Sequence, residues 1–246
     1  MRRLGMHIHC HAGVAMTMSY HVQAGLLCCK GALRYLVLGW LAVVCAGAAA
    51  HAAQEPEPRP ISSTIAMIGA GDMGQALGNL WAAAGYRVIF ATRHPDRLGD
   101  VVERAGHGAR AATVAEAIDQ AGIIVLAVPY AAEPDIARAH ARAMKNKVLV
   151  NVDNAIERRD GEIAKQAEAV GEAIYSARLF EGTRFIRAFN LKSAHSFPTP
   201  DTVDSAEFEV PYTVNDDSVR PIAEALIHDA GGTPVYEGGL ENAREY

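Results

Sequence analysis

A glycine-rich turn near residue 70 has the residue types and the spacing needed to hold a phosphate-bearing ligand. The turn reads Gly69-Ala70-Gly71-Asp72-Met73-Gly74 and matches the pattern G-x-G-x-x-G. Gly69 permits a tight turn, Gly71 has no Cβ to block a pyrophosphate, and Gly74 lets a helix pack close to a strand. Free N–H groups at a helix N-terminus favour the negative charge of a phosphate. The turn therefore predicts a site for a dinucleotide.

Three residues after the second predicted strand indicate which dinucleotide binds. A site for NAD usually has Asp or Glu about 20 residues past the glycines, where it binds the ribose 2′-hydroxyl. Here that strand ends at Ala91, and Thr92, Arg93 and Arg97 follow it instead. Arginine forms bidentate, charge-assisted hydrogen bonds to phosphate oxygens. The sequence therefore favours NADP(H), with the alternative that both arginines are ordinary surface charges.

The elements around the turn predict how these residues are positioned. Thr64–Ile68 is apolar and predicts a strand before the turn, residues 75–84 predict a helix after it, and Arg87–Ala91 predicts the second strand. This context is the one that the glycine pattern requires. Further strands are expected at residues 109–112, 123–128, 147–152, 185–189, 208–214 and 234–236, and further helices at 95–105, 113–120, 133–144 and 218–230. Such alternation predicts an α/β fold with a doubly wound parallel sheet, the Rossmann NAD(P)-binding fold, in a single domain.

The first 53 residues differ in composition from the rest. Residues 1–54 hold no Asp or Glu, yet they hold all four cysteines. Lys30 and Arg34 precede an apolar segment, residues 35–50, and an A-x-A site follows at residues 50–52. This order predicts a secretory signal peptide. The alternatives are a membrane anchor, for which the apolar segment is short, and an N-terminal extension that precedes the true start.

Removal of this region would leave 19 basic and 28 acidic residues, a net charge of −9, and no cysteine. We therefore expect no nucleic-acid partner and neither disulfides nor thiol catalysis. Alternating prolines at residues 54–60 predict an extended linker, and the folded domain is expected over residues 61–246. The mature protein is expected to be exported or periplasmic and not to span a membrane. The cytoplasm is the alternative if the signal peptide is not real.

Other polar residues are weaker candidates for chemistry. No Ser-His-Asp set and no H-E-x-x-H motif is recognisable. His195 is typical of an exposed residue at the start of a helix, and the histidines and cysteine at residues 7–11 lie in the segment expected to be removed. Asp153 and Asn154 follow a strand, where ligands bind in open α/β sheets, but they could equally form a turn or a helix cap. We therefore expect no metal ligand and no catalytic side chain.

Several separated motifs resemble one family of oxidoreductases. Besides the glycine turn, they are F-A-T-R at residues 90–93, A-V-P at 127–129, I-R-A-F-N at 186–190 and E-G-G-L-E-N-A-R at 237–244. Together they resemble the F420-dependent NADP oxidoreductase family, to which the reductase domain of STEAP metalloreductases is related. The resemblance covers the chain from about residue 63 to its C-terminus. It implies hydride transfer between NADPH and coenzyme F420 or a flavin-like acceptor, a small-molecule redox partner.

The resemblance also implies a role for each matched segment. The glycine turn would hold the pyrophosphate, and the T-R pair with its following basic residue would hold the 2′-phosphate. Val128, Pro129 and Ala188 would line the nicotinamide and the second redox partner. Because hydride transfer mainly needs two rings held face to face, no catalytic side chain is implied.

Three expectations about the whole protein stay open beside this one. The chain could instead be a non-catalytic NADP-binding module or subunit, and a homodimer is an option. The family has a long helix after its A-R segment, so the last helix is expected to be absent or incomplete at Tyr246.

Overall fold

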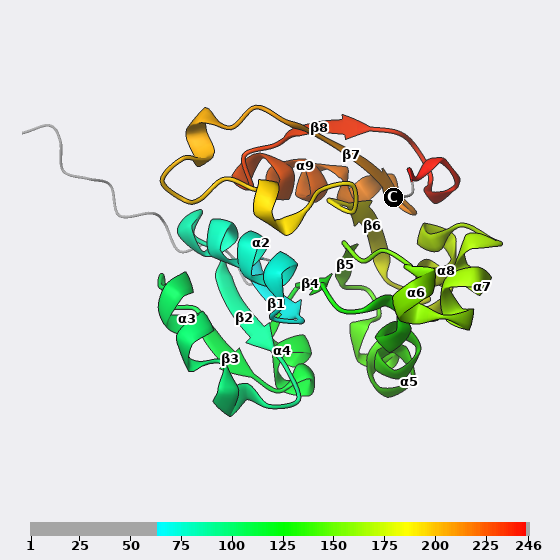
Figure 1. The fold of residues 1–246 in the computed structure, drawn as a ribbon, viewed down its shortest axis with the longest axis horizontal. Coiled ribbons are helices and arrows are strands. Elements are labelled where there is room, and N and C mark those ends of the chain that lie inside the picture. The colour runs from blue at the N-terminus through cyan, green and yellow to red at the C-terminus, as the bar shows by residue number, and fades with distance from the viewer. Residues whose placement is uncertain (1–62, 245–246) are drawn as a thin grey trace, which may run out of the picture. The chain divides into compact units, whose positions relative to one another are not determined.

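An eight-stranded sheet runs through the part of this computed structural model that is described, residues 63–244 (Figure 1). The strands are β1 Thr64–Ile68, β2 Arg87–Ala91, β3 Arg110–Ala112, β4 Ile123–Leu126, β5 Val148–Asn151, β6 Arg184–Ala188, β7 Glu209–Val214 and β8 Thr233–Tyr236. Their order in the sheet is β3-β2-β1-β4-β5-β6-β7-β8. The strand order reverses at β1, which pairs in parallel with β2 on one side and with β4 on the other.

Helices cover both faces of this sheet, because successive side chains of a strand point to opposite faces. The helices are α2 Asp72–Ala83, α3 Gly99–Ala105, α4 Val114–Gln120, α5 Glu133–Met144, α6 Glu157–Asp160, α7 Glu162–Glu168, α8 Glu172–Leu179 and α9 Arg220–Asp229. Ile65 and Met67 of β1 belong to a core that includes α2, α3 and α9. Ala66 and Ile68 belong to a second core, with α4, α5 and the end of α8. The predicted doubly wound α/β fold is thus confirmed.

The predicted direction of two strands is wrong. β7 runs antiparallel to β6, and β8 is parallel to β7. A parallel return needs a crossover of about a dozen or more residues that is usually helical. Between β6 and β7 the chain forms only two short 3₁₀ turns, η4 Ala194–Ser196 and η5 Val203–Ser205. Without a packed crossover helix, β7 turns back beside β6.

Glycines explain most of the other differences from the predicted elements. The helix predicted at residues 95–105 is broken into a 3₁₀ turn, η2 Pro95–Arg97, and α3, which begins at Gly99. The sequence analysis predicted no helix between residues 155 and 183, where α6, α7 and α8 lie. Gly161 and Gly171 separate these three helices with φ values of +60° and +90°, a conformation that glycine adopts readily. α2 begins at Asp72, three residues earlier than predicted, because Gly71 is its N-cap.

Some predictions concern residues outside the described part of the chain. These are the signal peptide or extension at residues 1–53, the histidine–cysteine cluster within it, and the linker at residues 54–60. The described residues belong to one compact unit. None of the helices between residues 63 and 244 is long and apolar enough to cross a membrane.

Candidate functional site

The glycine turn connects the carboxyl end of β1 to the N-terminus of α2, and its three glycines have different surroundings. At Gly69, φ is +104° and a Cβ would lie 2.1 Å from the carbonyl oxygen of Ala127. At Gly74, a Cβ would lie 2.1 Å from the carbonyl oxygen of Gly69. The exposed Gly71 has a φ of −75°, and no other protein atom lies within 4 Å of its Cβ position. Packing therefore requires glycine at residues 69 and 74, whereas the space at Gly71 is open to a ligand.

A side chain of α2 holds the turn in place. Gln75 donates a hydrogen bond from Nε2 to the carbonyl oxygen of Ala70 at 2.8 Å, and its Oε1 accepts one from Arg104 Nη2 of α3 at 2.9 Å. Gly78 lies one turn further along α2, where a Cβ would be 2.6 Å from Cζ of Phe90 in β2. Sequence reasoning missed both residues, although a second glycine at helical spacing from Gly74 was a signal for close packing on the sheet.

A cavity of about 470 Å³ opens at the carboxyl ends of β1, β2 and β4. This is the point where the strand order reverses, and ligands of open α/β sheets bind there. Five of the predicted site residues line it: Gly69, Thr92, Arg93, Val128 and Pro129. The wall formed by α4 and α5 includes the apolar Val114 and Ile136 together with Asp135 and His140. The cavity thus joins the glycine turn to the end of the second strand, as a dinucleotide site requires.

The two predicted phosphate-binding arginines are exposed. Arg93 lines the cavity, and Arg97 lies in η2 one turn later, outside the cavity lining. Within residues 63–244, neither guanidinium forms a hydrogen bond or an ion pair. Thr92 is half-buried, and its Oγ1 accepts a hydrogen bond of 3.4 Å from the N–H of His94. Both guanidiniums are therefore available to an anionic ligand.

The remaining predicted residues lie apart from the cavity. Ala70, Asp72 and Met73 belong to the turn and the first residues of α2, and they do not contribute to the cavity wall. Ala188, the last residue of β6, is buried in the core with only 1% of its surface exposed. His195 is exposed in η4 and lines none of the cavities described here. Of the phosphate-binding candidates, the cavity lining therefore brings together Gly69, Thr92 and Arg93, and Ala188 lies in the core.

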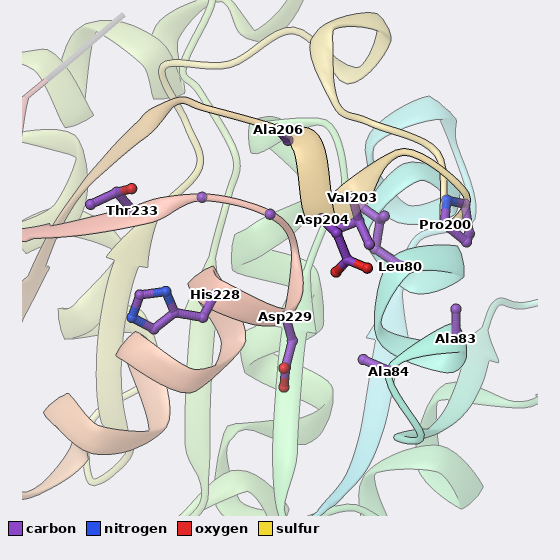
Figure 2. A pocket seen from close by; sticks show the side chains of 12 residues that line it. Leu80, Ala83, Ala84, Pro200, Val203, Asp204, Ala206, His228, Asp229 and Thr233 are labelled. Atoms are coloured by element: carbon purple, nitrogen blue, oxygen red, sulfur yellow. The ribbon is translucent and has the colours of Figure 1, made fainter. Parts of the chain in front are cut away.

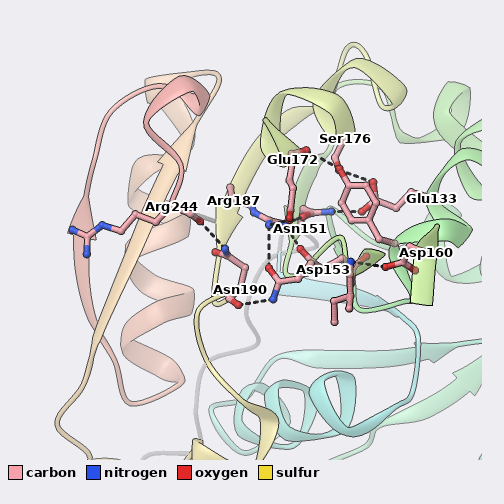
Figure 3. Close-up of polar contacts among 12 residues, drawn as sticks. Glu133, Asn151, Asp153, Asp160, Glu172, Ser176, Arg187, Asn190 and Arg244 are labelled. Carbon is pink, nitrogen blue, oxygen red and sulfur yellow. Dashed lines mark hydrogen bonds and ion pairs between the residues drawn. The ribbon is translucent and has the colours of Figure 1, made fainter. Parts of the chain in front are cut away.

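A buried polar cluster lies beside this cavity, at the ends of β5 and β6 (Figure 3). Its centre is Arg187 of β6, with 1% of its surface exposed. The guanidinium donates short hydrogen bonds to Asn151 Oδ1 and to the carbonyl oxygen of Asp153, and a bond of 3.2 Å to Asn154 Oδ1. It also forms an ion pair of 2.7 Å with Glu172 Oε2 of α8. One arginine therefore ties the loop after β5 to β6 and α8.

Two further carboxyl groups belong to the cluster. Glu133, fully buried at the start of α5, accepts hydrogen bonds from Asn151 Nδ2 at 2.7 Å and Ser176 Oγ at 2.6 Å. Asp153 Oδ1 accepts a hydrogen bond of 2.8 Å from the N–H of Val128. Burial raises the pKa of Asp153 well above its usual range, and the negative charge of Glu133 adds to the rise. Val128 lines the cavity, so the cluster and the cavity share a wall.

The cluster extends to the loop that follows β4. The buried Tyr130 donates a hydrogen bond from its hydroxyl to the carbonyl oxygen of Glu172 at 2.8 Å. Asp160 at the end of α6 accepts hydrogen bonds from the N–H groups of Ala131 and Ile156, and it forms an ion pair of 2.8 Å with Arg159. These contacts fix the backbone between Pro129 and Ala132, two residues that line the cavity.

Sequence reasoning placed Asp153 and Asn154 at the ligand edge but missed Glu133, Glu172 and Arg187 as members of a site. A charged residue inside the apolar run of β6 was the available signal, because a buried arginine needs a counter-charge.

The end of β6 leads into a second cavity. Phe189 follows β6 with a φ of +66° and packs against Trp81 at a ring-centroid distance of 5.8 Å. The next residue, Asn190, accepts a hydrogen bond from Asn154 Nδ2 at 2.7 Å and donates one to the carbonyl oxygen of Arg244 at 2.8 Å. The cavity, of about 230 Å³, is lined by Phe189, Leu191, Lys192, Glu209, Val210, Pro211 and Arg244. It therefore carries two cationic side chains at the same edge of the sheet.

A third cavity, also of about 470 Å³, lies at the opposite end of α2 from the glycine turn (Figure 2). Its wall includes Ala84 after α2, Asp204 of η5 and His228 and Asp229 of α9. None of the predicted site residues contributes to it. This cavity therefore is not a candidate for the dinucleotide.

The sheet order and the cavity at the strand reversal are those of a Rossmann-type dinucleotide-binding fold. Residues 64–155 match the family model described as NADP oxidoreductase, coenzyme F420-dependent. The F420-dependent NADP reductase of Methanothermobacter marburgensis is 29% identical over 189 residues, which cover 72% of this chain and 84% of that protein. The predicted resemblance to this family is thereby confirmed: residues 64–155 are similar to the family, and a longer stretch is similar to that reductase.

Two further comparisons show how much of each protein is similar to this chain. A candidate F420-dependent NADP reductase from Arthrobacter sp. FB24 has the same fold, with a TM-score of 0.60, 20% identity, and coverage of 73% of this chain and 86% of that chain. Glutamyl-tRNA reductase from Sorangium cellulosum is 32% identical over 99 residues, which are 39% of this chain and 19% of that protein. The chain thus spans about a fifth of that relative. The relation to the STEAP reductase domain stays a prediction.

Proposed function

We propose that this protein transfers hydride between NADPH and coenzyme F420 or a flavin-like acceptor. The observation that carries the proposal is the cavity at the strand reversal, which joins the glycine turn to Thr92 and Arg93. The family match and the reductase from Methanothermobacter marburgensis support the choice of acceptor.

The residues around the cavity fit an NADP cofactor. The open space at Gly71 admits a pyrophosphate at the N-terminus of α2, where free N–H groups favour negative charge. Arg93 and Arg97 have guanidiniums without partners within residues 63–244, and no Asp or Glu occupies the end of β2. A 2′-phosphate would gain charge-assisted hydrogen bonds there, whereas the ribose hydroxyls of NADH would gain little.

The acceptor would bind at the second cavity, beyond β6. Lys192, Arg244 and Glu209 line it, and Arg244 is paired with Glu237, so Lys192 is the cation that would favour the phosphate groups of F420, FMN or FAD. Lys192 Nζ lies 4.2 Å from the centre of the Phe208 ring, which holds the ammonium at the cavity without neutralising its charge. Asn190 lies between this cavity and the loop after β5, to which Asn154 connects it.

The chain's own residues would hold the nicotinamide and the acceptor ring in position for hydride transfer. When bound, NADPH supplies the hydride. Val128 and Pro129 form the wall on which the nicotinamide half would lie, and the buried cluster behind Val128 keeps that wall in place. No side chain has to become covalent or shuttle a proton, because the reaction needs mainly two rings in contact.

The test is NADPH oxidation by the purified protein with F420, FMN and FAD, each repeated with NADH. We expect turnover with at least one acceptor and a clear preference for NADPH. Tight binding of NADPH without reduction of any acceptor would instead support a non-catalytic NADP-binding module. Equal use of NADPH and NADH would contradict the assignment of Arg93 and Arg97.

A variant separates the acceptor site from the cofactor site. Lys192→Ala should raise KM for the acceptor about tenfold or more, the value of one charge-assisted contact, and leave KM for NADPH unchanged. Lys165→Ala is the matched control, because Lys165 is an exposed lysine on α7 that pairs with Glu157. An equal change of both KM values in the Lys192 variant would refute the placement of the acceptor.

We further propose that residues 1–53 are a signal peptide and that the mature protein is exported. The support is the basic region, the apolar segment and the A-x-A site in that order. N-terminal sequencing of the native protein tests this, and an intact N-terminus at Met1 in a cytosolic extract would refute it.

A further inference from the structure

The buried cluster holds more acidic groups than basic ones. Glu133, Asp153 and Glu172 expose 0%, 5% and 7% of their surfaces, and Arg187 is the one buried arginine among residues 63–244. An ionised carboxylate is stable in a protein interior only when it is paired or hydrogen-bonded. Because one guanidinium cannot pair with three carboxylates, we expect one of the three carboxyl groups to keep its proton.

The hydrogen bonds identify which carboxyl group holds a proton. Glu172 is paired with Arg187 at 2.7 Å, and each oxygen of Glu133 accepts a hydrogen bond, from Asn151 and from Ser176. Asp153 accepts one at Oδ1, while its buried Oδ2 has no hydrogen bond of ordinary geometry within the described residues. Burial raises the pKa of both carboxyl groups; hydrogen bonds from Ser176 and Asn151 offset part of the rise at Glu133, whereas the charge of Glu133 raises the pKa of Asp153 further. Asp153 is therefore the protonated member of the cluster.

The same residue contacts the wall of the cofactor cavity. Asp153 Oδ1 is 2.8 Å from the nitrogen of Val128, and Val128 and Pro129 line that cavity next to Gly69. Asp153 also follows β5, on the side of the strand reversal away from the glycine turn, where the nicotinamide half of a dinucleotide extends.

We propose that Asp153 is a charge-compensating residue of the nicotinamide site: it keeps its proton while the site holds the reduced cofactor, and it loses the proton when the site holds the oxidised cofactor. The inference rests on the proposed function, because it places the nicotinamide beside Val128. The O–H bond of the carboxyl group breaks, its electron pair stays on the oxygen, and the proton goes to the solvent. The negative charge then offsets the positive charge of the oxidised ring.

Charged and titratable groups from each neighbouring element bear on this ionisation. Glu133 of α5 opposes it, while Arg187 of β6 favours it and is itself shared with Glu172 of α8. Tyr130 in the loop after β4 stays protonated, because burial raises its pKa. A new positive charge at the cavity would favour ionisation of Asp153, and the oxidised nicotinamide brings one.

The experiment counts protons as each cofactor binds. The protein is titrated at pH 7 in weak buffer with a pH indicator, using saturating NADP⁺ in one series and saturating NADPH in the other. Both cofactors carry the same 2′-phosphate, so its own titration cancels in the difference. We expect NADP⁺ to release up to about one proton per site more than NADPH, the full count for a single carboxyl group.

Variants assign that proton to Asp153. Asp153→Asn should abolish the difference in proton release. An opposite charge nearby lowers a carboxyl pKa by about one to three pH units, so by reciprocity NADP⁺ should bind about tenfold or more weakly to the variant, with NADPH unchanged. Asp119→Asn is the matched control: it removes an exposed carboxylate of α4 that does not line the cofactor cavity, and the difference should persist.

A second variant covers the case in which Asp153→Asn does not fold. Glu133→Gln removes one of the two effects that raise the pKa of Asp153, so the pH at which the difference in proton release is largest should move downward, and an unchanged pH would contradict the inference. If the unmutated protein binds both cofactors and releases equal numbers of protons, the inference is wrong and the proposed function stands. If neither cofactor binds, the proposed function itself fails.

Discussion

Two alanine substitutions in the glycine turn, Gly71→Ala and Gly74→Ala, should have different effects. The first should weaken cofactor binding, and the second should mainly lower stability. In Gly71→Ala the new methyl group has no other protein atom within 4 Å, and φ of −75° with ψ of −171° suits any L-residue. We therefore expect the free energy of unfolding to change by about 0.5 kcal/mol or less. The methyl group would instead meet the pyrophosphate. Loss of a charge-assisted hydrogen bond to phosphate costs about 1.5–3 kcal/mol, roughly a tenfold to hundredfold loss of NADPH affinity.

The partner substitution should do the opposite. In Gly74→Ala the new Cβ would lie 2.1 Å from the carbonyl oxygen of Gly69, a backbone atom that can move only with the turn. Overpacking of this kind costs about 1–3 kcal/mol, which in a domain of this size lowers Tm by about 2–12 °C. NADPH affinity should fall as well, because the turn itself is displaced.

Thermal unfolding without cofactor and a fluorescence titration with NADPH measure the two effects on each variant. The reasoning is refuted if Gly71→Ala binds NADPH as tightly as the unmutated protein, or if it loses as much thermal stability as Gly74→Ala. A fall in stability with unchanged binding would show that Gly71 serves the fold and not the cofactor.

Three further outcomes are expected. Arg93→Ala should weaken NADPH binding about tenfold or more and leave NADH binding and Tm unchanged, because the exposed guanidinium has no partner within residues 63–244; isothermal titration with both cofactors checks it. Arg187→Met should lower the free energy of unfolding by about 3–5 kcal/mol, because the buried Glu172 loses the guanidinium that pairs with it at 2.7 Å; urea unfolding should also show partial recovery in the double variant with Glu172→Gln. Burial would raise the pKa of Asp160, but hydrogen bonds from Arg159 and two backbone N–H groups outweigh burial and lower it. The contribution of Asp160 to the free energy of unfolding is therefore present at neutral pH and is lost as the pH falls through that pKa. Asp160→Asn should therefore be less stable at pH 7, and urea unfolding in acid should show the difference shrinking.

Local sequence predicted the first half of the fold closely because its elements are defined by neighbouring residues. β2 has the predicted bounds, Arg87–Ala91, and the glycine turn lies between a strand and a helix as expected. The direction of β7 was not predictable in the same way, because alternation with a period of two is identical in parallel and antiparallel strands. Only the missing crossover helix before Glu209 distinguishes them.

The candidate site also has one part that local sequence predicts and one part that depends on how distant elements pack. The part proposed to bind phosphate is a continuous motif followed by three residues near the end of β2, and sequence spacing could predict that these residues lie close together. The buried cluster comes from α5, α8 and β6, where Glu133, Glu172 and Arg187 are separated by up to 54 residues. Which charges meet there depends on how these elements pack, and no local pattern contains that information.

The strand order also determines which strands are at the two edges of the sheet. Within the described residues these are β3, only three residues long, and β8, four residues long. A long, flat edge strand is a template for another chain, whereas short strands and proline protect an edge. β8 contains Pro234, which has no N–H to donate to a further strand. Two subunits are therefore poorly suited to join by continuing the sheet, and a homodimer of this chain would have to use its helical surfaces.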